Sequence, residues 1–123
     1  NKNWKLCGNI PYYISGFLFR TISELENKPK KIILMIQKEV AERIAAHAPD
    51  MNMLAASIQV WGVPKIIFKL GPEDFSPKPE VDSAIIEIDL KNNQLNKEEL
   101  KKYYETAKAI FKQPRKTLFN NLR

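Results

Sequence analysis

An unbroken run of five apolar residues, Ile32 to Ile36, limits what this chain can fold into. A strand with one exposed face alternates apolar and polar residues, whereas a run without alternation predicts a strand covered on both faces. Such strands occur mainly in parallel sheets that are flanked by helices. We therefore expect an α/β protein with this run inside its sheet.

The segments around the run predict the order of the other elements. We expect strands at 4–8, 32–36, 65–70 and 83–90, and helices at about 16–26, 38–48, 53–61 and 97–112, with a further helix over 115–123. Asn96 and Glu99 have the spacing of a capping box at the start of the fourth helix. This order corresponds to the C-terminal half of a doubly wound, Rossmann-like sheet, followed by the start of a small helical domain.

The segment GNIPYYIS, residues 8–15, joins the first expected strand to the first expected helix. Ligands of open α/β sheets bind beyond the carboxyl ends of the strands, which is where this segment lies. The Asn9 side chain offers an acceptor and two donors, the Pro11 carbonyl is expected to be free to accept, and the ring of Tyr12 offers a stacking face for a base. The segment could therefore hold a planar molecule with an exocyclic amine, or it could be a purely structural turn.

An amine held in this way has a definite chemistry. The exocyclic amine of adenine is a poor nucleophile because its lone pair is delocalised into the ring. Two acceptors beside the nitrogen would favour a more tetrahedral geometry and offset the positive charge that develops during attack. No strong base is needed before the attack, since the alkylated amine is briefly a strong acid and then loses its proton.

The positive charge of the chain is concentrated near its end. Residues 1–93 hold 12 Lys and Arg against 11 Asp and Glu, whereas residues 94–123 hold 8 against 3. A basic terminal segment predicts a polyanionic partner, most often nucleic acid, although a solvated lysine-rich helix is the alternative. The expected phosphate contacts are Lys108, Lys112, Arg115, Lys116 and Arg123. We expect Tyr103 and Tyr104 to pack in the core and not to stack on bases.

Several classes of protein are disfavoured by what the sequence contains. No apolar run approaches the roughly 20 residues of a membrane span, so no membrane partner is expected. One histidine, His47, and one cysteine, Cys7, give no basis for a metal site or an internal disulfide. A reducing cytoplasm is the simplest setting, with Cys7 as a small buried residue.

Four segments together resemble the ribosomal RNA adenine dimethyltransferase family. They are GNIPYYIS (8–15), MIQKEVAERI (35–44), FSPKPEVDSAIIEI (75–88) and FKQPRKTLFNNL (111–122), in the family's order. The second and fourth look like the kasugamycin-sensitivity type, which modifies small-subunit RNA, rather than the erythromycin-resistance type, which modifies 23S RNA. A non-catalytic nucleic-acid-binding relative is a further alternative, and adenine methylases that act on DNA resemble the first segment only.

The resemblance implies an activity and a role for individual residues. It implies transfer of methyl groups from S-adenosylmethionine to the N6 amine of adenosines near the 3′ end of 16S ribosomal RNA, during ribosome biogenesis. Asn9, Pro11 and Tyr12 would be the catalytic residues, and Asn9 and Ile10 would contact the cofactor. Tyr12 and Phe75 would stack on the flipped base. The implied partner is the small ribosomal subunit, and the full-length form would be a monomer.

The chain also departs from the family pattern. Pro114 stands where the family usually has arginine, Glu80 where lysine is common, and Met51-Asn52 where Tyr-Gly is frequent. The glycine-rich loop that cradles the cofactor in the family is missing from these 123 residues. We therefore expect residues 1–93 to be the C-terminal half of the catalytic domain and residues 94–123 the start of a basic helical RNA-binding domain. By itself the chain is expected to bind S-adenosylmethionine weakly and to be inactive.

Overall fold

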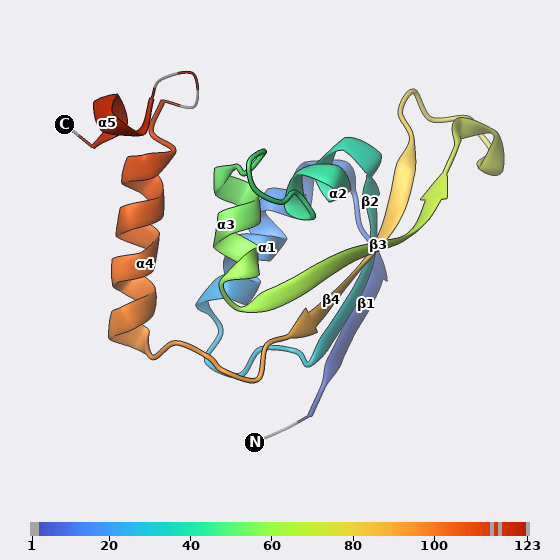
Figure 1. The fold of residues 1–123 in the computed structure, drawn as a ribbon. Coiled ribbons are helices and arrows are strands. Elements are labelled where there is room, and N and C mark those ends of the chain that lie inside the picture. The colour runs from blue at the N-terminus through green and yellow to red at the C-terminus, as the bar shows by residue number, and fades with distance from the viewer. Residues whose placement is uncertain (1–2, 114, 116, 123) are drawn as a thin grey trace.

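The computed structural model describes residues 3–113, 115 and 117–122. The elements in chain order are β1 (Lys5–Asn9), the short 3-10 helix η1 (Tyr12–Ile14), α1 (Ser15–Glu24), β2 (Lys31–Gln37), α2 (Lys38–Ile44), α3 (Met53–Gln59), β3 (Gly62–Leu70), the 3-10 helix η2 (Pro72–Asp74), β4 (Ser83–Leu90), α4 (Lys97–Ile110) and α5 (Leu118–Asn121). Helices α1, α2 and α3 lie on one face of the sheet, and α4 lies outside α3 (Figure 1). The expected α/β fold is thus confirmed.

The sheet is mixed, which differs from the parallel sheet that the apolar run predicts. Its strand order is β1-β2-β4-β3; β1 and β2 are parallel, whereas β4 is antiparallel to both β2 and β3. Asn9 pairs with Met35, while Ser83 lies opposite Gln37 on one side and Leu70 on the other. The carboxyl ends of β1, β2 and β3 and the amino end of β4 therefore meet at one end of the sheet.

The run in β2 is buried unequally on its two faces. Ile32, Leu34 and Ile36 point toward the helices and are at most 1% exposed, whereas Ile33 and Met35 are half-buried. The described helices thus bury one face of the sheet at β2 and β4, and the covering of both faces predicted from the run is not seen among the described residues. The core under the helices is completed by large side chains of α1, α2, α3 and β4, with Trp61 between α3 and β3.

Local signals placed some boundaries correctly and others not. The capping box is present, because the Asn96 side chain accepts from the Glu99 N–H at 2.8 Å and the Glu99 carboxylate accepts from the Asn96 N–H at 3.2 Å. Helix α2 ends four residues earlier than predicted. Within the predicted helix at 115–123, the described residues form only α5, since residues 116 and 123 lie outside the described part of the chain. Cys7 is exposed and not buried, because it lies on β1, an edge strand of the described sheet.

Gly62 marks a place where the backbone of β3 approaches β4 too closely for a side chain. A Cβ atom added there would lie 2.6 Å from Cγ2 of Ile88, which is itself fully buried. We expect Gly62→Ala to lower the free energy of unfolding by about 1–3 kcal/mol through overpacking. Urea denaturation measures this. Gly16→Ala in α1 is the matched control, since a Cβ there meets nothing within 4 Å, and an equal loss in both variants would contradict the prediction.

Candidate active site and basic surface

The backbone of the GNIPYYIS segment turns sharply where β1 ends. Asn9 is the last residue of β1 and is exposed, and Pro11 immediately precedes η1. The Pro11 carbonyl accepts a hydrogen bond from the Ile14 N–H at 3.1 Å. The expectation that this carbonyl is free is therefore wrong in part, although a carbonyl oxygen has a second lone pair with which it can accept. Ile10, between Asn9 and Pro11, is half-buried and packs against the core.

Tyr12 is fixed at both of its ends. Its backbone carbonyl accepts from the Ser15 hydroxyl at 2.7 Å, at the start of α1. Its phenol oxygen lies 2.5 Å from the hydroxyl oxygen of Ser83, the first residue of β4. Tyr12 as a residue is half-buried. The structure thus places a half-buried tyrosine shortly after an exposed asparagine, at the sheet end where the sequence predicted a ligand.

The second and third family-like segments contact each other at this same end. The Lys38 N–H donates to the Asp82 carbonyl at 2.9 Å, and the ammonium group of Lys38 lies 3.8 Å from the Asp82 carboxylate. The carboxylate of Glu42 forms an ion pair with the ammonium group of Lys69, the penultimate residue of β3, at a distance of 3.5 Å. Together with the contact between Tyr12 and Ser83, these bonds join three segments that are distant in the sequence.

Phe75, the expected second aromatic wall, lies in the loop between β3 and β4. It is half-buried and follows η2, so its loop leaves and rejoins the sheet at the end where Asn9 lies. No ring contact between Phe75 and Tyr12 occurs in the described part of the chain. A role for Phe75 in base stacking therefore remains a prediction.

Helix α4 is attached to α3 by two tyrosines. The phenol of Tyr103 donates to the Ala56 carbonyl at 2.8 Å, and the phenol of Tyr104 donates to the Ser57 carbonyl at 3.0 Å. Partial burial raises the pKa of both Tyr103 and Tyr104 above that of a free phenol. Both side chains are therefore packing residues, as their spacing indicated.

The docking of α4 brings Lys108 into a hollow of about 590 Å³ that also contains Arg20 of α1 and Arg43 of α2. Among the described residues, Glu24 is the one carboxylate that lines this hollow. The three cations outnumber it, so the hollow has a net positive charge. The sequence pattern missed Arg20 and Arg43, since they are isolated cations on helices with nearly balanced charge. Only the packing of α1, α2 and α4 brings them close to Lys108. Lys112 and Arg115 are exposed beyond the end of α4, whereas Lys116 and Arg123 lie outside the described residues.

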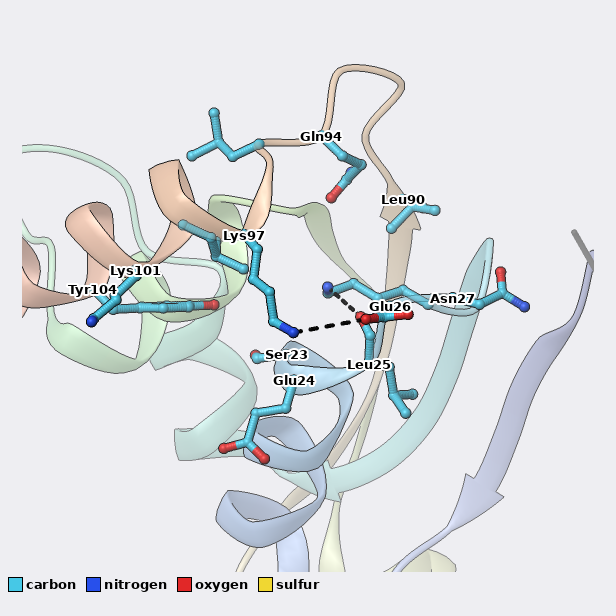
Figure 2. Close-up of a pocket in the computed structure, with 13 residues that line it drawn as sticks. Ser23, Glu24, Leu25, Glu26, Asn27, Leu90, Gln94, Lys97, Lys101 and Tyr104 are labelled. Carbon is cyan, nitrogen blue, oxygen red and sulfur yellow. Dashed lines mark hydrogen bonds and ion pairs between the residues drawn. The ribbon is translucent and has the colours of Figure 1, made fainter.

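A second hollow, of about 610 Å³, lies between the end of α1 and the start of α4 (Figure 2). Its walls include Leu90 and Leu100, and its rim carries an ion pair of 3.8 Å between Lys97 and Glu26. The Lys28 ammonium donates to the Leu25 carbonyl at 2.8 Å, and burial lowers the pKa of Lys28. This hollow lies at the opposite end of α1 from Tyr12, so it is not a candidate for chemistry at the GNIPYYIS segment.

The described residues offer neither a metal site nor a membrane-spanning helix. No group of three or more His, Cys, Asp and Glu side chains in this part of the chain could hold a metal ion. No helix formed by the described residues has the length and apolar character required to cross a membrane.

Comparisons with known proteins agree with one another. A model of the family described as ribosomal RNA adenine dimethylase matches residues 1–123. A ribosomal RNA small subunit methyltransferase A of Dehalococcoides mccartyi is 37% identical over 99% of the chain, and one of Mesomycoplasma hyopneumoniae is 40% identical over 95%. The chain spans only 42% and 46% of the lengths of these two relatives.

Two solved structures have the same fold. A dimethyladenosine transferase from Plasmodium falciparum aligns over 99% of this chain and 45% of its own, with a TM-score of 0.80 and 27% identity. The 23S rRNA methyltransferase ErmE aligns over 98% of this chain and 50% of its own, with a TM-score of 0.80. At 20% identity, the second likeness concerns the fold alone.

Proposed function

Because the chain belongs to the ribosomal RNA adenine dimethylase family, we propose that a complete enzyme containing it methylates ribosomal adenosines. By complete enzyme we mean a polypeptide of the relatives' full length that includes these 123 residues. The reaction transfers methyl groups from S-adenosylmethionine to the N6 amine of adenosines near the 3′ end of small-subunit RNA. The observation that carries the proposal is the arrangement of Asn9, Pro11 and a doubly anchored Tyr12 at the end of β1.

Each residue of this arrangement has a role in the proposed reaction. The Asn9 side-chain oxygen accepts a hydrogen bond from one N–H group of the amine. The remaining lone pair of the Pro11 carbonyl accepts a hydrogen bond from the other. The ring of Tyr12 stacks on the adenine after it has left its helix, and Phe75 supplies a second wall. The proton of the alkylated amine then leaves to water, so the site needs no ionised base.

The described residues fit part of a cofactor site. S-adenosylmethionine, when bound, supplies the electrophilic methyl group. The exposed amide of Asn9 can bond to the polar methionyl end of such a cofactor, and half-buried Ile10 offers an apolar surface beside it. The same amide would then contact both the cofactor and the amine, and would orient the amine toward the methyl group.

The choice of the small subunit rests on the relatives. The two curated relatives above are named as small subunit methyltransferases, whereas the large-subunit enzyme ErmE shares only the fold. An intact Asn-Ile-Pro-Tyr sequence also favours an enzyme over a non-catalytic nucleic-acid binder, which has no need of two acceptors at one amine. We further propose that the complete enzyme acts in the cytoplasm as a monomer.

The division of labour in the chain follows its charge. Residues 1–93 belong to the catalytic domain, and residues 94–123 begin a basic helical domain that binds RNA. The basic surface, which we define as the cations around the first hollow and beyond α4, would contact RNA phosphates; it comprises Arg20, Arg43, Lys108, Lys112 and Arg115. Lys116 and Arg123 are proposed as further contacts on the basis of the sequence alone.

Replacing three cations of the basic surface should weaken the salt dependence of RNA binding. Each phosphate contact contributes roughly one unit to the slope of log K against log salt, so Lys108→Gln, Lys112→Gln and Arg115→Gln together should lower the slope by about three. Filter binding of a small-subunit RNA fragment at several salt concentrations measures it. Lys5→Gln, Lys65→Gln and Lys91→Gln remove the same charge from exposed sites elsewhere, and an equal change of slope in both triple variants would contradict the assignment.

The activity itself can be tested directly. The complete enzyme is incubated with radiolabelled S-adenosylmethionine and either small or large ribosomal subunits that lack the modification. We expect N6,N6-dimethyladenosine near the 3′ end of the small-subunit RNA, detected by primer extension and by nucleoside analysis. Modification of the large subunit alone, or RNA binding without any methylation, would refute the proposal and favour one of the two alternatives.

A further inference from the structure

Ser83 is a buried serine whose hydroxyl group contacts the candidate active site. Its residue is 1% exposed, and its hydroxyl oxygen lies 2.5 Å from the phenol oxygen of Tyr12, which is 71 residues away in the sequence. A buried hydroxyl requires a hydrogen-bond partner, and most serines find one in nearby backbone. Ser23 and Ser57 do so, since each donates to a carbonyl of its own helix. Ser83 instead bonds to a side chain that has been assigned a catalytic role.

The position of Ser83 makes it a rigid anchor. As the first residue of β4, it lies between Gln37 of β2 and Leu70 of β3, in the interior of the sheet. The preceding residue, Asp82, is bonded to Lys38 through both backbone and side chain. A group held on three sides loses little freedom when it forms one more bond, so it can fix a neighbour at small entropic cost.

We propose that Ser83 is a positioning residue that holds the ring of Tyr12 in the place where it stacks on the adenine. This inference rests on the proposed function. Ser15 fixes the backbone of Tyr12, but the ring can still rotate about its two side-chain torsions. The bond to Ser83 holds the phenol oxygen and so restrains the first torsion, which sets where the ring lies; the second torsion turns the ring about an axis through that oxygen. The ring is therefore in place before RNA binds. Less conformational entropy is then lost when the ring stacks on the base, so more of the stacking free energy contributes to binding.

A double-mutant cycle tests whether Ser83 acts through Tyr12. In the complete enzyme, Tyr12→Phe and Ser83→Ala each remove one hydroxyl of the same bond, and each should lower kcat/KM for small ribosomal subunits by about threefold to tenfold. The double variant should lose no more than either single variant, because the bond is already broken. The KM for S-adenosylmethionine should stay the same in all three. Thr21→Val, which removes an exposed hydroxyl of α1, is the matched control and should change neither constant.

A second readout reports on stacking without requiring methyl transfer. A small-subunit RNA fragment with 2-aminopurine at the target adenosine should fluoresce more brightly when bound to Tyr12→Phe or Ser83→Ala than when bound to the parent enzyme, because a loosely held ring quenches less. Melting temperatures identify a variant that fails to fold. If Ser83→Ala does not fold, Tyr12→Phe alone must show both effects, and its failure to do so overturns the inference.

The outcomes separate this inference from the proposed function. Losses that multiply in the double variant, or a loss in Ser83→Ala without one in Tyr12→Phe, would show that Ser83 has only a structural role. The proposed function would survive either result if Asn9→Ala still lowered the methylation rate by about 100-fold or more. If the parent enzyme methylates no ribosomal RNA, both the proposed function and this inference are wrong.

Discussion

Replacing Asn9 with alanine should lower the rate of adenosine methylation in the complete enzyme by about 100-fold to 1000-fold. The alanine variant removes one of the two acceptors that offset the charge developing on the amine, and the loss of one preorganised group of this kind typically has that effect. Asn9 is exposed at the end of β1, so its truncation leaves no buried cavity and should not change the unfolding temperature. Single-turnover kinetics with saturating S-adenosylmethionine measure the rate.

The control for this experiment is another exposed asparagine. Asn93 lies in the connector between β4 and α4, away from the carboxyl end of β1, so Asn93→Ala should leave the rate unchanged. An undiminished rate in Asn9→Ala would contradict the proposed mechanism. A drop in both variants would point to a general effect on folding, which the melting temperatures would show.

Some features of the fold follow from local sequence and others do not. The apolar run of β2 and the alternation of β4 each predict a strand at nearly the correct residues. The apolar run wrongly favoured parallel pairing, and the alternation of β4 does not indicate strand direction, because it has the same period in parallel and antiparallel pairs. The sequence patterns could therefore not predict the antiparallel pairing of β4, because the direction of β4 depends on the path of the preceding loop.

The end of α2 shows why helix boundaries are difficult to predict. Apolar residues continue at helical spacing to Ala48, yet the helix ends at Ile44. The Gln59 side chain, from α3, donates to the carbonyls of Ile44 and Ala46 at 2.8 Å, and Asn52 donates to the Arg43 carbonyl at 2.9 Å. These distant amides satisfy the last carbonyls of α2. No property of residues 38–48 alone could reveal them.

Some residues of the candidate site can be predicted from local sequence, whereas others cannot. Asn9, Pro11 and Tyr12 are neighbours in the sequence, so the residue types at the end of one strand were enough to identify them. Ser83 was missed as a functional residue, although its segment was noticed, because its contact with Tyr12 depends on the pairing of β4 with β2. Tertiary packing likewise unites the basic surface across three helices.

Replacing Trp61 with alanine should lower the free energy of unfolding by about 3–5 kcal/mol, which is the usual cost of truncating a large buried aromatic side chain. Trp61 is 1% exposed and connects α1 with the segment that follows β4. Its indole N–H donates to the Ser23 hydroxyl of α1 at 3.0 Å, and its carbonyl accepts from the Lys91 N–H at 2.9 Å after β4. Since small domains are stable by about 5–15 kcal/mol, this one change could remove much of the total.

The measurement is the midpoint of denaturant unfolding in the parent protein and the variant, with the slope of the transition fitted separately. An unchanged slope would show that Trp61→Ala alters stability and not the surface exposed on unfolding. Phe68→Ala is the matched control, because Phe68 is an aromatic residue of edge strand β3 that is 58% exposed, and its loss should cost less than about 1 kcal/mol. Equal shifts in the two variants would contradict the assignment of Trp61 to the core. The bond to Ser23 places the buried indole against the last turn of α1, at the opposite end of that helix from Tyr12.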